Sequence, residues 1–352
     1  MTVPTLDILP PVTGLKELPT ETRAGLAVAL GQRAEIEAFA ADAVRKGLRN
    51  VYLIGSGGGL LTHEGVQYLL ERRSTAFPVF ALSANEFIYR DPASLGAGSI
   101  VVFASNTGTT PEVVEAARFA REHGATTAAV TRLADSPLAQ AVDAAWVYGD
   151  DAGVGDPKSF ELAILALALL RETGAMDAAE YAAHISTLEA LPAALLTACH
   201  ETETLNARIA SELRDAPIIY VIGAGPNHGT AYCLAMCYLQ EMQWKHAASF
   251  DSAEFLHGAM EVVTDGTAVI QFLGEEATRP IDERAKAFLQ KYTSKAFFVD
   301  SRDLTLPGIA PEMRSFASHF ALDAVMSRLA QHFEAATGHD LKNRRYMFKV
   351  EY

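Results

Sequence analysis

The chain has 352 residues, of which 49% are hydrophobic and 20% are charged, as expected for a folded globular protein with room for two domains. Its formal net charge of −14 argues against a broad surface for nucleic acid or anionic membrane, since such surfaces need clustered Lys and Arg. The three cysteines form no disulfide framework and no zinc pattern. A small anionic ligand that is bound locally stays compatible with this composition.

The N-terminal residues lack the positively charged start of a secretory signal. The longest apolar run, residues 162–170, is far shorter than the roughly 20 residues that cross a membrane. We therefore expect a cytoplasmic protein with no membrane partner and no nucleic-acid partner.

Short β-branched or aromatic runs alternate with longer helical segments along the chain, and the residues before 45 also read as helical. This alternation predicts βαβ units, and so an α/β fold with parallel sheets flanked by helices. The predicted strands are residues 51–54, 79–82, 100–104, 127–131, 218–222, 268–273 and 296–299.

An internal repeat organises the chain. VYLIGSG at 51–57 recurs as IYVIGAG at 219–225, and Glu86-Phe87 recurs as Glu254-Phe255, in each case 168 residues later. A constant offset over this distance predicts two duplicated α/β halves. We expect an N-terminal helical cover at 1–44, a first half at 45–175, and a second half at 176–352 that opens with an Ala- and Leu-rich helical stretch.

A predicted phosphate loop follows the third strand of the first half, where residues 104–111 read ASNTGTTP. Thr110 can cap the next helix, and Pro111 suits the first turn of that helix. Hydroxyl and amide side chains beside the N–H groups of a helix N-terminus favour a bound phosphate. The candidate ligands are Ser105, Asn106, Thr107 and Thr110. The second half has Glu275 and Glu276 in the corresponding segment, and these carboxylates would repel the same ligand.

A glycine-rich turn, residues 55–59, follows the first strand and lets a ligand approach the backbone at Gly55, Ser56 and Gly57. It does not have the GxGxxG spacing of dinucleotide-binding proteins, because Leu60 stands at the last position. Open α/β sheets bind ligands at the carboxyl ends of their strands, where both loops are expected. The alternative is a capped loop without a ligand.

The candidate base is Glu241, the only formally charged residue of the apolar helix predicted at 228–244. Leu234, Cys237 and Tyr238 share its stripe at helical spacing, so the carboxylate should face packed protein or a cleft. Burial of this kind raises the pKa of a carboxyl and produces a usable base. The alternative is a Glu at the end of the helix that pairs with Lys245.

The candidate acid is His257, for which the alternative is a histidine that packs in the core or caps a turn. The repeat places Tyr89 at the position of His257 and Arg73 at that of Glu241, so the shared framework requires neither an imidazole nor an acid there. Titratable groups in one half and a phosphate loop in the other suggest proton transfer on a phosphorylated substrate.

At these residues the chain resembles the sugar isomerase (SIS) domain family, which consists of phosphosugar binders and isomerases. The SNTGTT loop is similar to the phosphate loop of that family, and GDPKSF is similar to the segment that opens the helix after the first half. Glu241 precedes His257-Gly258 by sixteen residues, the spacing and order of the catalytic pair in the isomerase half of glucosamine-6-phosphate synthase.

Within that family, EFLHGAMEVV, TRPIDERAKAFLQKYT and RRYMFKVEY look most like the fructosamine-6-phosphate deglycases, the fructoselysine 6-phosphate deglycase group. The resemblance implies cleavage of a phosphorylated Amadori compound to glucose 6-phosphate and a free amine. It implies that Glu241 is the base and His257 the acid, and that a homodimer forms in which the histidine reaches the site of the partner. Proton transfers of this kind require no metal or redox cofactor.

The resemblance leaves some alternatives open. An aldose–ketose isomerase or an aminosugar-phosphate deaminase would use the same pair, and some SIS modules are sensors without catalytic activity. The family often has a polar residue where Gly57 stands, so the contacts there fall to Ser56 and backbone N–H groups. The synthase has a tail lysine near the sugar, and the residue that replaces it here is left open among Lys342, Arg344, Arg345 and Tyr346.

Overall fold

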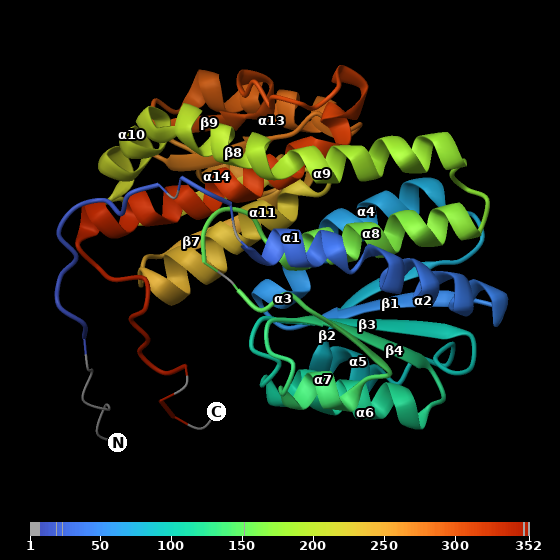
Figure 1. The fold of residues 1–352 in the computed structure, drawn as a ribbon. Coiled ribbons are helices and arrows are strands. Elements are labelled where there is room, and N and C mark those ends of the chain that lie inside the picture. The colour runs from blue at the N-terminus through green and yellow to red at the C-terminus, as the bar shows by residue number, and fades with distance from the viewer. Residues whose placement is uncertain (1–7, 19, 23, 151, 348, 351–352) are drawn as a thin grey trace. The chain divides into compact units, whose positions relative to one another are not determined.

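The computed structural model describes residues 8–18, 20–22, 24–150, 152–347 and 349–350, so residues 1–7 of the predicted helical cover lie outside the described part. The first half forms a parallel five-stranded sheet in the order β2-β1-β3-β4-β5 (Figure 1). The strands are β1 (Asn50–Gly55), β2 (Val79–Ser83), β3 (Ser99–Ser105), β4 (Thr126–Thr131) and β5 (Ala144–Val147).

The second half forms a parallel four-stranded sheet in the order β7-β6-β8-β9. Its strands are β6 (Ile219–Gly223), β7 (Ala247–Asp251), β8 (Ala268–Leu273) and β9 (Ala296–Asp300). The predicted α/β class with two parallel sheets is confirmed. Strands β5 and β7 are missing from the prediction because AAWV and AASFD are short and rich in Ala, which is depleted in strands.

The two sheets repeat each other in register. Val51 lies opposite Val79 on one side and Ile100 on the other, and 168 residues later Ile219 lies opposite Ala247 and Ala268. The helices after the third strand of each half also begin at this offset, at Pro111 and Arg279. The duplication inferred from the sequence therefore extends to individual residue positions.

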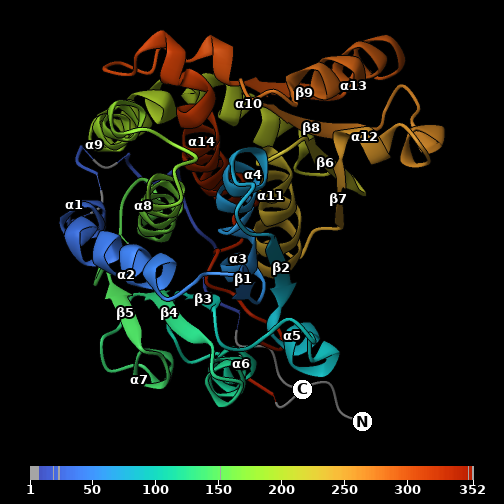
Figure 2. The ribbon, with the colours of Figure 1, turned by 90° about the vertical axis from the view of Figure 1, so that its right-hand side faces the viewer.

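Helices cover both faces of the first sheet, with α5, α6 and α7 on one face and α1, α2 and α8 on the other (Figure 2). In the second half α13 and α11 lie on opposite faces of the sheet (Figure 2). The helices of the first half are α1 (Ala24–Gly31), α2 (Arg33–Arg45), α3 (Gly58–Leu61), α4 (Glu64–Arg73), α5 (Ala84–Arg90), α6 (Pro111–Glu122), α7 (Pro137–Ala141) and α8 (Pro157–Glu172). Those that follow are α9 (Ala178–Glu201), α10 (Glu203–Leu213), α11 (Asn227–Tyr232), the π-helix η1 (Cys233–Met242), α12 (Ser252–Phe255), the 3₁₀ turns η2 (Ala259–Val262), η3 (Ser301–Asp303) and η4 (Pro311–Met313), α13 (Arg279–Tyr292) and α14 (Arg314–Thr337).

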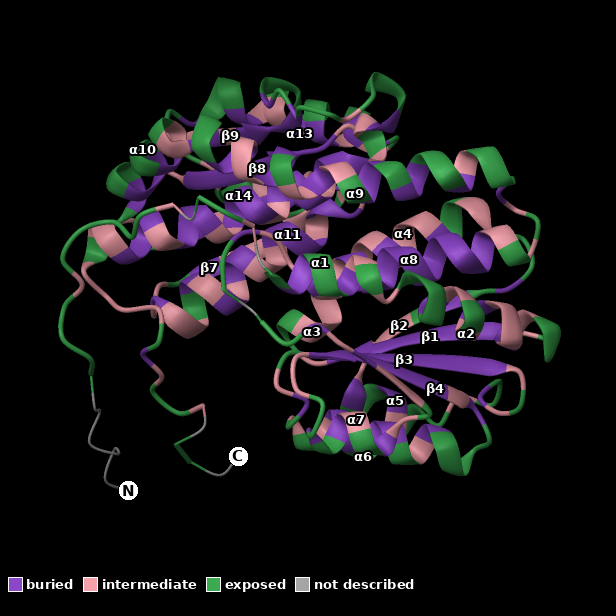
Figure 3. Cartoon of the chain, viewed as in Figure 1, coloured by how far each residue is buried: buried purple, intermediate pink, exposed green. Residues whose placement is uncertain are grey.

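Burial follows this layering. Strands β1 and β3 are buried along their whole length, and α8 is buried almost all round, as an apolar core helix should be (Figure 3). Among the described residues, helix α9 is long and apolar enough to cross a membrane by length and composition alone, and half of its most apolar window is buried in the protein.

The chain separates into two compact units that differ from the three predicted segments. One unit holds residues 19–197 and 305–321, and the other holds 1–18, 198–304 and 322–352. Among the described residues of the predicted helical cover, the first helix begins at Ala24. Residues 8–18 contain no helix and run beside the C-terminal segment, where the Val12 N–H donates to the carbonyl of Gly338 and the Leu9 N–H donates to Asn343 Oδ1.

Candidate active site

The predicted phosphate loop lies at the carboxyl end of β3, where Ser105 is buried and Asn106 is exposed. Ser105 Oγ accepts a hydrogen bond from the Gly108 N–H at 3.2 Å and lies 3.3 Å from Thr110 Oγ1. Thr107 Oγ1 lies 2.7 Å from Thr109 Oγ1. These bonds bring the hydroxyl groups together around the five-residue loop between β3 and α6.

Thr110 stands at the N-cap of α6 and Pro111 at the first helical position, as predicted. The Thr110 hydroxyl does not bond to the helix backbone, however, and lies against Ser105 instead. The loop needs Gly108, whose φ is +64° and whose missing Cβ would lie 2.3 Å from Ser136 Oγ. Tyr148 fixes the other side of the loop, since its hydroxyl donates to Asn106 Oδ1.

The glycine turn lies beside this loop, because β1 and β3 are neighbours and Gly55 is in register with Ala104. Gly57 has a φ of +54°, in the left-handed region that glycine favours. A Cβ on Gly59 would lie 2.2 Å from the carbonyl oxygen of Ala104, so this glycine serves the packing of the turn against β3. Gly55, Ser56 and Gly57 thus share one edge of the sheet with the phosphate loop.

The corresponding place in the second half holds a carboxylate of the protein itself. Glu276 is buried, and its Oε2 accepts a hydrogen bond from Asn227 Nδ2 at 2.9 Å. A Cβ on Gly274 would collide with this carboxylate. The two halves therefore differ at this loop, because the second has a carboxylate where the first has hydroxyl groups.

Glu241 lies near the end of η1, a ten-residue π-helix where the sequence predicted a continuous α-helix. The prediction of helix type is wrong because a π-helix bonds each residue to the fifth one along, a pattern that apolar spacing does not reveal. Wide helical turns of this kind are frequent at functional sites. The predicted burial is met, since the Glu241 side chain is only 22% exposed.

The partner of Glu241 is Arg344 of the C-terminal tail. Arg344 Nη2 lies 2.9 Å from Glu241 Oε1, and its own side chain is 17% exposed. The alternative pairing with Lys245 is wrong, because the ammonium group of Lys245 donates to the carbonyl of Arg214. Burial raises the pKa of Glu241, while the charge and the hydrogen bond of Arg344 lower it.

Trp244 secures the tail at this place. Its backbone has a φ of +52°, which is rare for a bulky residue and ends the helix abruptly. Its ring lies 4.6 Å from the His339 ring and 4.5 Å from the Arg345 guanidinium. Of the four tail residues left open, Arg344 is therefore the one that contacts the candidate base, Arg345 stacks on Trp244, and Lys342 and Tyr346 are exposed.

His257 is exposed, so the alternative of a buried core histidine is wrong. It follows the four-residue helix α12 and precedes the exposed Gly258. The framework role of Phe255 is confirmed, since Phe255 and its counterpart Phe87 are both fully buried. Tyr89, the counterpart of His257, is 87% exposed, so the repeat presents this position to solvent in both halves.

No cluster of three or more His, Cys, Asp or Glu side chains suited to a metal ion occurs among the described residues. The three cysteines are free thiols, with Cys199 and Cys237 buried. The groups available for chemistry at these places are the Glu241 carboxylate, the His257 imidazole and the hydroxyl groups of the phosphate loop.

Known proteins are similar to the chain over most of its length. The family model described as the SIS domain matches residues 48–148, which contain the whole first sheet. The fructosamine deglycase FrlB of Bacillus subtilis is 32% identical over 323 residues, which cover 90% of this chain and 97% of that protein. The fructoselysine 6-phosphate deglycase of Escherichia coli K12 is 27% identical and covers 88% and 89% of the two chains.

Among solved structures, a Bacillus subtilis protein described as a phosphosugar isomerase aligns with a TM-score of 0.86 and 31% identity, and covers 93% of this chain and 100% of its own. The chain belongs to the SIS domain family and is an enzyme.

Proposed function

We propose that the enzyme cleaves 6-phosphofructosyl amines, which are phosphorylated Amadori compounds, to glucose 6-phosphate and a free amine. Two relatives named as deglycases align over nearly the whole chain and support this reaction class. The observation that carries the proposal is the half-buried Glu241 carboxylate, whose pKa burial raises toward the range of a general base.

In the proposed mechanism Glu241 removes a proton from C1 of the open-chain substrate, next to the C2 carbonyl, and an enaminol forms. A proton delivered at C2 gives an aldimine at C1. Water then adds to C1 and the C1–N bond breaks, which releases glucose 6-phosphate and the amine. Each positioned proton transfer contributes about 10²–10⁴-fold in rate. Glu241 acts as the base, and His257 assists ring opening and carries the proton to C2.

The proposed phosphate-binding groups are those of the two loops at the carboxyl ends of β1 and β3. They are Gly55, Ser56, Gly57, Ser105, Asn106, Thr107 and Thr110. Hydroxyl groups and backbone N–H groups would bind the phosphate by hydrogen bonds, and the dipole at the N-terminus of α6 would stabilise its negative charge.

A substrate panel tests the reaction. Purified enzyme is incubated with 6-phosphofructosyl derivatives of several amino acids, and glucose 6-phosphate and free amine are measured together. Equal amounts of both products are expected for at least one derivative. Sugar-phosphate isomerisation or ammonia release from an aminosugar phosphate, without cleavage of any Amadori compound, would place the enzyme among the isomerases or deaminases instead.

The role of the base is tested with Glu241→Gln, which should abolish turnover and leave substrate binding intact by calorimetry. Glu254→Gln is the matched control, since this carboxylate is exposed and recurs as Glu86 in the first half. Full activity in Glu241→Gln would exclude Glu241 as the base.

We further propose a homodimer in which His257 reaches the site of the partner subunit, and the exposure of this side chain supports the idea. Mixing inactive Glu241→Gln subunits with inactive His257→Ala subunits should restore activity, because one of the two sites in a mixed dimer would be intact. Verified subunit exchange without rescue would show that each chain supplies both groups of its own site.

A further inference from the structure

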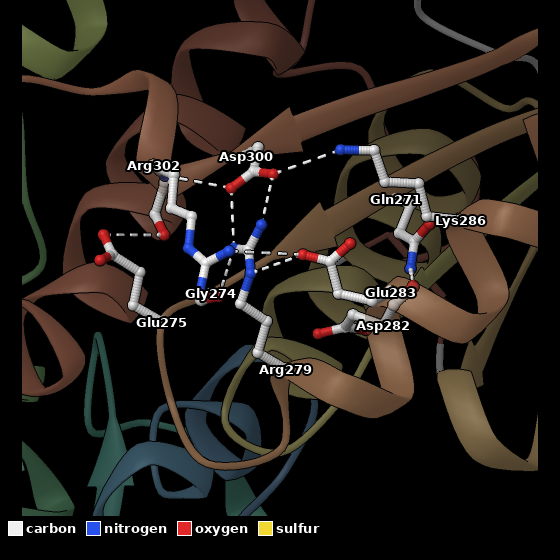
Figure 4. A network of polar contacts seen from close by, with 10 residues as sticks. Gln271, Gly274, Glu275, Arg279, Asp282, Glu283, Lys286, Asp300 and Arg302 are labelled. Atoms are coloured by element: carbon white, nitrogen blue, oxygen red, sulfur yellow. Dashed lines mark hydrogen bonds and ion pairs between the residues drawn. The ribbon is translucent and has the colours of Figure 1, made fainter.

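A buried polar network lies at the carboxyl end of the second sheet. Ser252 Oγ donates to Asp282 Oδ1 at 2.6 Å, and Gln271 Nε2 donates to the backbone oxygen of Asp282 at 2.8 Å. Asn227 Nδ2 donates to Glu276, whose charge acts on Asp282. Each of these five residues is at most 4% exposed. Figure 4 shows Gln271 and Asp282 beside the ion pairs at the start of α13.

The repeat shows that the framework does not require this network. The residues 168 positions earlier are Gly59, Ala84, Phe103, Gly108 and Val114. All five are small or apolar, and the first sheet folds with the same strand register and the same helix starts. Burying polar groups costs free energy unless they are well paired, so their presence in one half alone indicates a role in what that half does.

The network ends at the segment that carries His257. Ser252 is the first residue of α12, which has only four residues, and His257 lies two residues beyond its end. A single helical turn does not hold its own geometry, so its direction depends on tertiary anchors. Two such anchors are present: the Phe255 ring in the hydrophobic core and the Ser252 hydroxyl on Asp282.

We propose that Asp282 is a positioning residue for His257 and acts through its hydrogen bond to Ser252 at the root of α12. This inference rests on the proposed function, in which His257 carries a proton. A hydroxyl bonded to a carboxylate is a short, charge-assisted contact, stronger than a bond between neutral groups. It fixes the start of α12, while Phe255 fixes the other end of that helix.

The surroundings of Asp282 make this anchor sensitive to pH. Burial raises the pKa of Asp282 to about 7, and the charges of Glu276 and Asp251 act in the same direction against the hydrogen bonds of Ser252 and Gln271. Arg279 and Lys286 of α13 are engaged elsewhere, since both contact Asp300. The other charged residues of α13 and α12 are Glu283, which pairs with Arg279, and the exposed Glu254, Arg284 and Lys291. The bond to Ser252 therefore strengthens as pH rises through about 7.

The test replaces the network residues by those of the first half, where the fold accepts them. Ser252→Ala and Asp282→Val should each lower kcat on the order of 10-fold with little change in KM, because displacement of a catalytic group acts on the chemical step. Hydrogen exchange of the amides of residues 253–257 should become faster in both. The double variant should lose no more than either single variant, since both remove one bond.

Asp282→Asn retains an oxygen that accepts the Ser252 hydrogen bond but cannot ionise. It should keep most of kcat and slow exchange in 253–257, and its kcat should lose the part of the pH dependence near 7 that Asp282 causes. Ser99→Ala, which removes another buried hydroxyl in the first sheet, is the matched control and should leave all three measurements unchanged.

Wild-type kcat and wild-type exchange in folded Ser252→Ala and Asp282→Val would overturn the proposal, and so would additive losses in the double variant. If the wild-type enzyme cleaves no Amadori compound, the proposed function fails, and hydrogen exchange still decides whether Asp282 holds the segment of His257. Faster exchange with unchanged kcat in an active enzyme would show that the anchor is structural only, and would also overturn the positioning role.

Discussion

The contact between Arg344 and Glu241 allows a prediction about the pH range in which the enzyme works. Arg344→Gln removes the positive charge that lies 2.9 Å from the carboxylate of the proposed base. Burial then raises the pKa of Glu241 without the opposition of the guanidinium. Since a base must be ionised to accept a proton, the acid limb of the kcat/KM profile should move to higher pH.

The size of the shift follows from the geometry of the pair. Two unit charges about 4 Å apart interact by roughly 4 kcal/mol in an effective dielectric of 20, and solvent screening reduces this value for partly exposed groups. A carboxylate beside Arg typically has its pKa lowered by about 1–3 units. With both side chains about one-fifth exposed, we expect the low end of this range, an upward movement of roughly 1–2 pH units.

The assay is steady-state kinetics with the best 6-phosphofructosyl substrate between pH 5 and 9. Arg344→Lys keeps the charge and should restore most of the acid limb. Lys342→Gln removes an exposed charge from the same tail and should leave the limb in place. An acid limb at the wild-type pH in Arg344→Gln would show that Arg344 does not set the pKa of Glu241. A uniform loss of activity at all pH values would indicate that the tail contributes to substrate binding alone.

Three further predictions concern stability and the phosphate loop. The pKa of Asp282 is raised from 3.8 to about 7, so the free energy of unfolding should fall by roughly 4 kcal/mol as pH rises from about 4 to 7. Urea unfolding of Asp282→Asn should lack this pH dependence. The buried Arg328 lowers the pKa of Glu203 to about 2, so the ion pair stabilises the fold above pH 4.5 and this stabilisation is lost as pH falls toward 2. Glu203→Gln should lower the free energy of unfolding by about 3–5 kcal/mol at pH 7 in the same assay, because it leaves the Arg328 charge unpaired. Gly108→Ala combines a φ of +64° with a clash on Ser136, a strain of about 1–3 kcal/mol, and should raise KM more than it lowers kcat. An unchanged KM in Gly108→Ala would show that this loop does not contribute to substrate binding.

The fold could be predicted from the sequence because the strand and turn patterns are local and occur in both halves. Strand β1 is a compact apolar run that ends in glycine, and the copy 168 residues later repeats the pattern. The same repeat distinguished framework residues such as Phe255 from the position of His257. Strand β5 has neither a strong local signal nor a copy in the second sheet, so periodicity alone did not detect it.

The surroundings of the candidate base could not be predicted, because they arise from contacts between residues far apart in the chain. Lys245 is one helical turn from Glu241 and is the natural partner by spacing, but Trp244 adopts a left-handed backbone and ends the helix between them. Arg344 reaches the carboxylate from the tail instead. The left-handed residue was not evident in the sequence, since bulky side chains rarely adopt that conformation.

The two halves place opposite electrostatic groups on one framework. Where the first loop has Gly108, the second half has Glu276, whose buried carboxylate accepts a hydrogen bond from Asn227. A phosphate would meet a buried negative charge there, which costs far more than an exposed one. We therefore expect one phosphate per chain, at the first half. In the second half, burial instead raises the pKa of Glu241 and of Asp282, and a dianion bound beside either carboxylate would raise that pKa further.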